Sequence, residues 1–237
     1  MADIKLEQLS KHYKRGGEVI RALDGVTLDI TGAEFVAVVG RSGSGKTTML
    51  DLMGLLLRPT SGRLLIEGVN TGELSDSERA HMRARKIGFV FQEYNLLASL
   101  NVIENVMLPL RYTKGVRDGR QRATELLERV DLTDRVKHRP GELSGGQQHR
   151  VAIARSMINR PSLILLDEPT GAVDTETAEQ LVALLKRINR QEGVTIIVVT
   201  HDLDIAAQAG RVIRLKDGKV IADDAQVPAG GVRQLLT

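Results

Sequence analysis

The amino-acid sequence predicts an α/β fold built around a mostly parallel central sheet. Continuous apolar runs read as strands buried on both faces, at residues 35–39, 87–92, 163–167 and 195–201. Stretches with helical spacing separate these runs, and that alternation is typical of a parallel sheet covered by helices. Two further patterns modify the fold: a half-exposed antiparallel β part near the N-terminus, and a helical subdomain inserted after residue 92.

The first half of the chain supplies the antiparallel part and the first helices. We expect short strands at 4–9, 26–30 and 63–68 and a helix at 46–57. Val26, Leu28 and Ile30 alternate with polar residues, which indicates a strand with one exposed face. Ser75, followed three residues later by Glu78, forms the pattern of a capping box, which opens a helix to about Arg85.

The second half continues with helices, two more buried strands and a hairpin. Helices are expected at 101–108, 117–130, 144–158 and 175–191, and a hairpin at 211–222 around the Asp217-Gly218 turn. We therefore predict one domain over residues 1–237. Its parts are a core of about 1–92 and 160–222, a helical subdomain of about 93–159, and a C-terminal tail of 223–237.

Composition limits the kinds of function. The 33 basic and 30 acidic residues give a net charge of only +3, which argues against a dedicated nucleic-acid binder. The chain has no cysteine, so disulfides and thiolate metal sites are excluded. No apolar run approaches the length of about 18 residues that a membrane-spanning helix needs. If this protein works at a membrane, we expect another chain to span it.

The segment GRSGSGKTT at residues 40–48 carries the strongest chemical signal. It matches the P-loop pattern G-x-x-x-x-G-K-[ST] and lies between a buried strand and a helix, as that motif requires, so a P-loop NTPase fold is expected. Backbone N–H groups at such a helix start bind phosphate oxygens. Lys46 would reach the β- and γ-phosphates, and the Thr47 hydroxyl would ligate Mg²⁺. The expected nucleotide-binding residues are Gly40, Ser42, Gly43, Ser44, Gly45, Lys46, Thr47 and Thr48.

Polar side chains follow three of the buried strands at the edge where doubly wound sheets bind ligands. Asp167 would hold Mg²⁺, and Glu168 would orient or deprotonate the attacking water. Gln92 is a candidate Mg²⁺ or water contact and His201 a candidate γ-phosphate contact, although either residue type alone would more often be an ordinary surface group. Tyr13 could stack on adenine, or could simply pack at the rim of the fold.

A second glycine-containing helix start, LSGGQ at 143–147, narrows the chain to one family of P-loop proteins that it resembles. Together with the P-loop, Gln92, LILLDE, the AVD segment at 172–174 and His201, it resembles the motif order of ATP-binding cassette (ABC) ATPases over about residues 3–222. The resemblance implies a head-to-tail dimer, most simply a homodimer, in which this turn covers ATP bound by the other subunit. The residues implied are Ser144, Gly145, Gly146 and Gln147, with Asp174 in the D-loop. Val173 and His149 depart from the usual family residues, and we expect altered tuning there without loss of hydrolysis.

The amino-acid sequence around these motifs resembles the subfamily that serves lipoprotein release, macrolide and haem efflux, peptide-antibiotic resistance and cell division. That likeness implies an ATPase at the cytoplasmic face of the cell membrane. It would drive export or extraction by a separate four-helix permease with an extracytoplasmic domain. Such coupling needs a groove for a permease helix, and Tyr94 and Leu96-Leu97 are its expected surface, with Phe89 and Phe91 in the core. A soluble ABC ATPase, for example in iron–sulfur assembly, and a regulator that does not transport are the alternatives.

Overall fold

The computed structural model describes residues 3–113, 118–171 and 173–225. Its larger sheet has six strands in the order β10-β9-β3-β8-β7-β6. The strands are β3 (Phe35–Val39), β6 (Ile87–Val90), β7 (Leu163–Asp167), β8 (Thr195–Thr200), β9 (Arg211–Lys216) and β10 (Lys219–Ala225). All neighbours pair in parallel except the β9–β10 hairpin at one edge, so the predicted mostly parallel sheet is confirmed.

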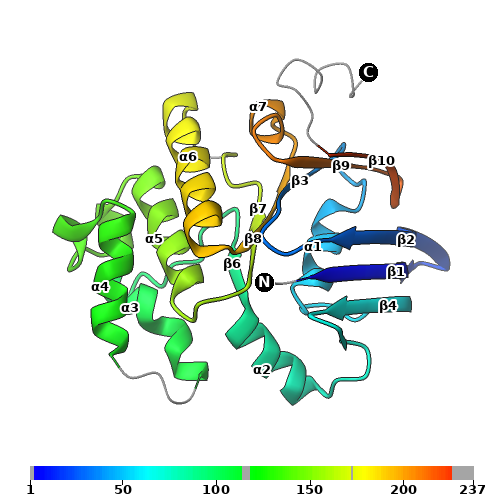
Figure 1. Ribbon diagram of the computed structural model, residues 1–237, viewed down its shortest axis with the longest axis horizontal. Helices are drawn as coiled ribbons and strands as arrows, with labels where there is room; N and C mark the ends of the chain where they lie inside the picture. The colour runs from blue at the N-terminus through cyan, green and yellow to red at the C-terminus, as the bar shows by residue number, and fades with distance from the viewer. Residues whose placement is uncertain (1–2, 114–117, 172, 226–237) are drawn as a thin grey trace.

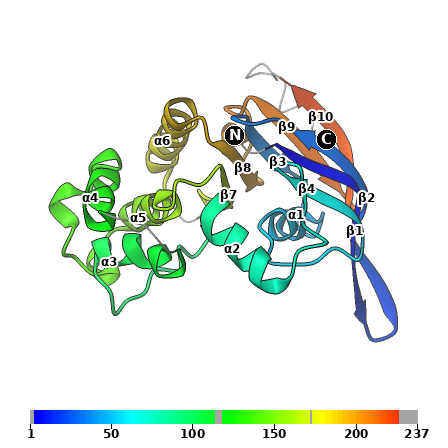
Figure 2. The same cartoon turned by 60° about the horizontal axis from the view of Figure 1, so that its bottom comes forward.

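The N-terminal β part forms a separate antiparallel sheet in the order β2-β1-β4-β5. Its strands are β1 (Ile4–Arg15), β2 (Glu18–Ile30), β4 (Ser61–Ile66) and β5 (Val69–Asn70). The strands expected at 4–9 and 26–30 are much longer than predicted, and their hairpin extends well beyond the rest of the molecule (Figure 2). Polar residues at 10–22 do not show the alternation of a one-sided strand, which is why the sequence did not mark this extension.

Helices α1 (Lys46–Met53), α2 (Asp76–Lys86), α3 (Val102–Met107), α4 (Gly119–Arg129), α5 (Gly145–Met157), α6 (Thr175–Glu192) and α7 (Leu203–Ala206) complete the fold. Short 3₁₀ turns lie at Leu108–Tyr112, Thr133–Arg135 and Pro140–Glu142. The capping box at Ser75 and Glu78 opens α2 as predicted. Helix α1 ends at Met53, earlier than expected, because Leu55 adopts a left-handed φ of 59° that a helix cannot continue through.

The larger sheet is buried on both faces, and successive residues of each central strand enter different cores. Ala37 and Val39 of β3 pack into the core shared with helices α3 to α6, whereas Val36 and Val38 pack against α1 and the antiparallel sheet. This two-sided burial explains why the central strands are continuous apolar runs instead of alternating patterns. The strands whose carboxyl ends carry the polar motifs are therefore packed between two hydrophobic cores.

Helices α3, α4 and α5 gather on one side of the molecule, away from the antiparallel sheet (Figure 1). This arrangement is the inserted helical part that the sequence predicts, and we retain 93–159 as its proposed extent. The tail predicted from 223 begins later, since β10 continues to Ala225; residues 226–237 lie outside the described part. Among the described residues, no helix combines the length and the apolar character needed to cross a bilayer.

Candidate active site

A cleft of about 1050 Å³ lies at the carboxyl ends of β3, β7 and β8 and extends along the P-loop. It brings together most of the residues that the sequence singles out: Tyr13, Ser42, Gly43, Gly45, Lys46, Thr47, Thr48, Gln92, Asp167, Glu168 and His201. Gly40 and Ser44 line a smaller cavity of about 310 Å³ beside the same loop. Ser144, Gly145, Gly146, Gln147 and Asp174 line neither cavity.

The P-loop has the backbone geometry that a phosphate cradle needs. Gly45 has a φ of 105°, and a Cβ placed on it would lie 2.2 Å from the carbonyl oxygen of Ala22. Only glycine fits this position, so the loop can begin α1 with its N–H groups directed outward. The Lys46 ammonium is largely buried and donates to the carbonyl oxygens of Gly40 (2.8 Å) and Arg41 (3.2 Å). These are neutral partners, which an anionic phosphate can replace.

Two carboxylates, Asp167 and Glu168, line the cleft together with the P-loop residues. Burial raises the pKa of Asp167, and the nearby charges of Glu168 and Asp51 raise it further, whereas Lys46 and a hydrogen bond from Thr47 act in the other direction. Asp51, one turn after Thr47 on α1, also has its pKa raised by burial. This excess of negative charge favours a cation at Asp167 and Thr47.

These residues fit a magnesium ion bound together with nucleotide. Within the described residues no cluster of three or more His, Asp or Glu side chains could enclose a metal unaided. Mg²⁺ usually takes one or two carboxylates and completes its ligands with phosphate oxygens and water. Asp167 and Thr47 provide that kind of partial ligand set.

Glu168 and His201 contact each other across the ends of β7 and β8. The Glu168 carboxylate oxygen Oε2 lies 2.8 Å from His201 Nδ1 and accepts a 3.2 Å hydrogen bond from the His201 backbone N–H. Glu168 has a left-handed φ of 46°, and its own N–H donates to the Val199 carbonyl (2.9 Å). The contact fixes the carboxylate at the cleft wall, where it can meet a water beside a phosphate.

Gln92 enters the cleft from a turn and not from a strand end. Strand β6 stops at Val90, two residues before the predicted end. The side-chain amide of Gln92 comes close to Gly171, since a Cβ built on Gly171 would lie 3.6 Å from Gln92 Nε2. Gln92 therefore lies in a turn beside the segment that follows Glu168.

Tyr13 lies at the outer end of the cleft, on the long hairpin. Its side chain is 38% exposed, with the Lys11 ammonium 5.3 Å from the ring centroid. Ile20 is its partner across the hairpin and also lines the cleft, with 46% of its surface exposed. An aromatic ring beside an exposed aliphatic side chain forms an apolar surface suited to a base. Ile20 was not recognised from the sequence, because the length of the hairpin was not.

The LSGGQ turn opens α5 as predicted, and two of its side chains form hydrogen bonds that cap the helix. Ser144 Oγ accepts from the Gln147 N–H (3.3 Å), and Gln147 Oε1 accepts from the Ser144 N–H (3.0 Å), so the two residues form a capping box. A Cβ on Gly146 would lie 2.7 Å from the methyl group of Thr177 at the start of α6. This glycine is therefore needed for packing within the chain as well as for any approach of a ligand. Ser144 and Gly145 are exposed.

Asp174 caps helix α6 beside the LSGGQ turn. Its carboxylate accepts from the Thr177 backbone N–H (2.9 Å) and from the Thr177 hydroxyl (2.8 Å). Of its D-loop neighbours, Ala172 lies outside the described residues, and Val173 is partly buried. The predicted D-loop and the LSGGQ turn therefore meet at Thr177, outside the cleft.

His149, flagged from the sequence as a departure, is only 1% exposed. Its ring lies against that of Tyr94, with centroids 5.0 Å apart. Among the described residues, neither ring nitrogen has a hydrogen-bond partner, and burial lowers its pKa to about 4. His149 is thus a neutral packing residue of α5 and does not face the cleft.

Comparison with known proteins places these features in a family. A family model for ABC transporters matches residues 23–171. The uncharacterized ABC transporter ATP-binding protein MJ0796 of Methanocaldococcus jannaschii is 49% identical over 222 residues, covering 92% of this chain and 94% of that protein. The macrolide export ATP-binding/permease protein MacB of Hyphomonas neptunium is 47% identical over 227 residues, covering 95% of this chain but only 35% of MacB.

The same relationship holds among solved structures. The dimeric structure of MJ0796 in a post-hydrolysis state bound to ADP and Pi matches with a TM-score of 0.87 at 45% identity, covering 94% of this chain and 98% of that one. The stretch matched by the family model contains the P-loop, Asp167 and Glu168, and the relatives and the solved structure match more than nine tenths of the chain. The chain belongs to the ABC transporter family, as one of its ATP-binding and ATP-hydrolysing cassettes.

Proposed function

We propose that this cassette works at the cytoplasmic face of the cell membrane and powers the export or extraction of a substrate by a separate permease. The observation that carries the proposal is an apolar groove of about 660 Å³ that shares a chain segment with the nucleotide cleft. The macrolide export relative, an ATP-binding/permease protein, supports a membrane partner for this groove.

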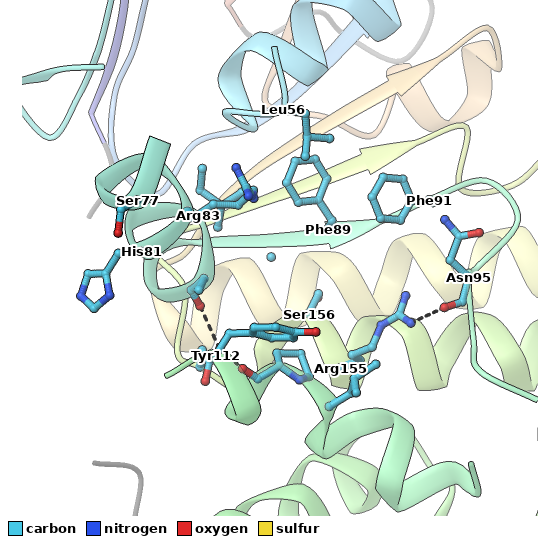
Figure 3. A pocket seen from close by; sticks show the side chains of 17 residues that line it. Leu56, Ser77, His81, Arg83, Phe89, Phe91, Asn95, Tyr112, Arg155 and Ser156 are labelled. Atoms are coloured by element: carbon cyan, nitrogen blue, oxygen red, sulfur yellow. Dashed lines mark hydrogen bonds between the residues drawn. The ribbon is translucent and has the colours of Figure 1, made fainter. Parts of the chain in front are cut away.

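The groove lies between α2 and the helical part of the molecule (Figure 3). The Phe89 and Phe91 rings stack along it, with centroids 5.3 Å apart and planes inclined by 2°. Tyr112, 73% exposed, and Leu56, 44% exposed, also line it. A concave surface with aromatic and aliphatic walls suits the apolar face of a short helix.

This lining corrects the surface expected from the sequence. Phe89 packs against the core as expected, with its ring on Gly54, but it also lines the groove; Phe91 is partly buried and lines the groove. Tyr94 turns inward onto His149, and its hydroxyl is buried. Leu97 is 46% exposed but does not line the groove. Tyr112 is therefore a sharper probe of the groove than Leu97.

Groove and cleft are joined by adjacent residues. Phe91 lines the groove, Gln92 lines the cleft, and Asn95 lines the groove again. A helix seated in the groove would contact the same backbone that presents Gln92 to the nucleotide. This adjacency supports coupling between permease movement and ATP hydrolysis.

In the cleft we propose that Lys46 and the P-loop N–H groups bind the β- and γ-phosphates, and that Tyr13 packs on adenine. Thr47 and Asp167, with Gln92 nearby, would hold Mg²⁺, which supplies charge neutralisation for the phosphates when bound. Glu168 orients the attacking water and accepts its proton, while His201 holds the Glu168 carboxylate and reaches toward the γ-phosphate. The buried, carboxylate-rich wall supports these assignments.

We further propose that two copies pack head to tail, so that Ser144 and Gly145 of one copy cover the nucleotide of the other. Both residues are exposed at the start of a 13-residue helix and lie outside the cleft of their own chain. The free N–H groups at that helix start favour an anion. The dimeric ADP-bound and Pi-bound structure of MJ0796 supports this arrangement.

The proposal is tested by capture of a membrane partner and by its effect on hydrolysis. The tagged chain is recovered from detergent-solubilised source membranes, and co-purifying proteins are identified by mass spectrometry. We expect a permease that stimulates ATP hydrolysis in proteoliposomes. Tyr112→Asp should abolish capture and stimulation without changing ATP binding. Val69→Asp is the matched control, since Val69 is 42% exposed and lies outside the groove.

A soluble partner alone, or equal capture by the wild type and Tyr112→Asp, would contradict this reading. A soluble partner would indicate that the chain is one of the ABC ATPases that do not transport. Equal capture would place the permease contact on another surface. In both cases ATP hydrolysis itself would stand.

A further inference from the structure

The turn that follows Gln92 has an unusual backbone. Tyr94 and Asn95 both adopt left-handed conformations, with φ values of 59° and 49°. Side chains with a Cβ rarely occupy this region, and for a residue as bulky as tyrosine it is a true outlier. Within the turn, the Tyr94 N–H donates to the Phe91 carbonyl (3.0 Å), and the Asn95 N–H donates to the Glu93 carbonyl (2.6 Å). These local hydrogen bonds alone do not prevent the turn from adopting another backbone conformation without the left-handed φ values.

Arg155 of α5 binds this turn from the protein interior. Its Nη2 donates to the Tyr94 carbonyl and its Nη1 to the Asn95 carbonyl, each at 2.6 Å. Figure 3 shows the guanidinium directed at Asn95. In this conformation both carbonyls accept from the same guanidinium. A planar fork of donors is suited to such a pair of acceptors, whereas a single ammonium is not.

The guanidinium depends on the turn as much as the turn depends on it. Arg155 is only 9% exposed, and burial lowers its pKa. Across the described ranges no carboxylate forms an ion pair with Arg155, and its guanidinium forms hydrogen bonds to the two carbonyl oxygens instead. A buried cation needs such hydrogen bonds to remain inside. Strained turn and buried charge therefore stabilise each other.

We propose that Arg155 is a positioning residue for ATP hydrolysis: it fixes the left-handed turn at Tyr94 and Asn95 and thereby sets where Gln92 stands in the cleft. Arg155 lines the groove and not the cleft, so it acts through the backbone and touches no nucleotide. Helix α5 begins at the Ser144 turn, and His149 of the same helix packs on Tyr94. The inference rests on the ATPase activity of the family and on Gln92 facing the cleft. It does not depend on export or on a permease.

The test compares Arg155→Leu, Arg155→Lys and Asn95→Gly, alone and combined, by steady-state ATP hydrolysis of the full chain. Arg155→Leu should lower kcat about tenfold or more, since small misplacements of catalytic groups have effects of this size, while KM for ATP changes less than about twofold. Arg155→Lys should fall in between. Glycine adopts left-handed φ without strain, so adding Asn95→Gly to Arg155→Leu should restore part of the lost kcat, while Tyr94 keeps the larger share of the strain. Asn95→Gly alone gives the reference rate against which the double variant is compared.

Arg79→Leu is the matched control for loss of a buried arginine. Arg79 is 4% exposed and donates to the carbonyls of Thr71, Leu55 and Leu57, none of which belongs to the turn after Gln92. It should lower the melting temperature without lowering the kcat of the folded protein, and Asn95→Gly should not improve it. Hydrogen exchange gives a readout apart from activity: amides 93–97 should exchange faster in Arg155→Leu and return toward wild type in the double variant.

A wild-type kcat in Arg155→Leu, or a double variant as slow as the single one, would overturn the proposal. If Arg155→Leu does not fold, Arg155→Lys with and without Asn95→Gly decides the question by the same comparison. A loss of ATP affinity equal to the loss of kcat would also count against it, because that would show collapse of the cleft. None of these outcomes bears on whether a permease occupies the groove.

Discussion

Replacing His149 with leucine should remove an acid sensitivity from the fold. Burial lowers the pKa of His149 from its ordinary value of 6.5 to about 4. Between these values the unfolded chain carries a protonated His149 and the folded chain a neutral one. The unfolded state therefore binds more protons, and the free energy of unfolding falls as the pH is lowered through this window. Above pH 6.5 the contribution of His149 is constant.

The size of this effect follows from the two pKa values. A difference of about 2.5 pH units at about 1.4 kcal/mol per unit gives a loss of about 3 kcal/mol between pH 7 and pH 4. Domains of this kind are stable by only about 5–15 kcal/mol, so one residue accounts for a large share. Tyr94, the ring in contact with His149, has its pKa raised by burial and stays neutral throughout the window.

The assay is urea unfolding followed by circular dichroism, at about pH 7 and about pH 4, for wild type and His149→Leu. Leucine has a similar volume and removes two buried nitrogens that lack partners among the described residues, so the variant should be at least as stable at pH 7. Between the two pH values it should lose about 3 kcal/mol less than wild type. His81→Leu is the control, since His81 lies exposed on α2.

Parallel loss of stability in wild type and His149→Leu would refute the reasoning. Titration of the carboxylates lowers the free energy of unfolding of both proteins equally and cancels in the difference between them. A parallel loss would then mean that His149 is already protonated in the folded chain, with a partner for its charge. The same result in His81→Leu and His149→Leu would assign the acid sensitivity to neither ring.

Three further predictions concern the cleft and the LSGGQ turn. Glu168→Gln should keep ATP binding and lower hydrolysis about 10²-fold or more, because the amide cannot accept a proton; a parental rate in a phosphate-release assay would exclude Glu168 as the base. Ser144→Ala removes the cap of α5, which should cost about 1 kcal/mol of unfolding free energy, and should lower hydrolysis without weakening ATP binding to the monomer by calorimetry; equal loss of both would indicate misfolding. Gly45→Ala forces a Cβ against the Ala22 carbonyl, so ATP affinity measured by equilibrium dialysis should fall about tenfold or more, and unchanged affinity would show that the loop does not depend on this contact.

The features that the sequence predicted well are those with strong local patterns. The run FVAVV and the other buried strands could be placed closely, because residues that enter two cores must all be apolar. The Ser75 cap was placed correctly because a capping box depends on residues three apart. The P-loop motif likewise specifies its own backbone, through Gly45.

The features it did not predict depend on contacts between distant residues. Nothing local marks Leu55 or Tyr94 as left-handed, since neither is glycine or asparagine. Arg155 reads as an ordinary arginine on a helix until the fold brings it to carbonyls 60 and 61 positions away. Tyr94, expected at the surface, packs on His149, and Phe91, expected in the core, lines the groove. The proposed coupling groove therefore lies beside the segment expected from the sequence but is lined by other side chains.

The charges in the cleft support the proposed division of the site between two chains. Asp167 and Glu168 line the cleft, and the Asp51 charge raises the pKa of Asp167. Lys46, Arg21 and Asp217 also line it. Nucleotide phosphates entering this cleft would therefore meet more acidic than basic side chains. A bound divalent cation offsets part of this, and the exposed helix start at Ser144 could offset more, but it lies outside the cleft of its own chain. A second copy can bring such a helix start to the open side of the phosphates, which is why we expect hydrolysis to rise with the square of cassette concentration until the dimer saturates.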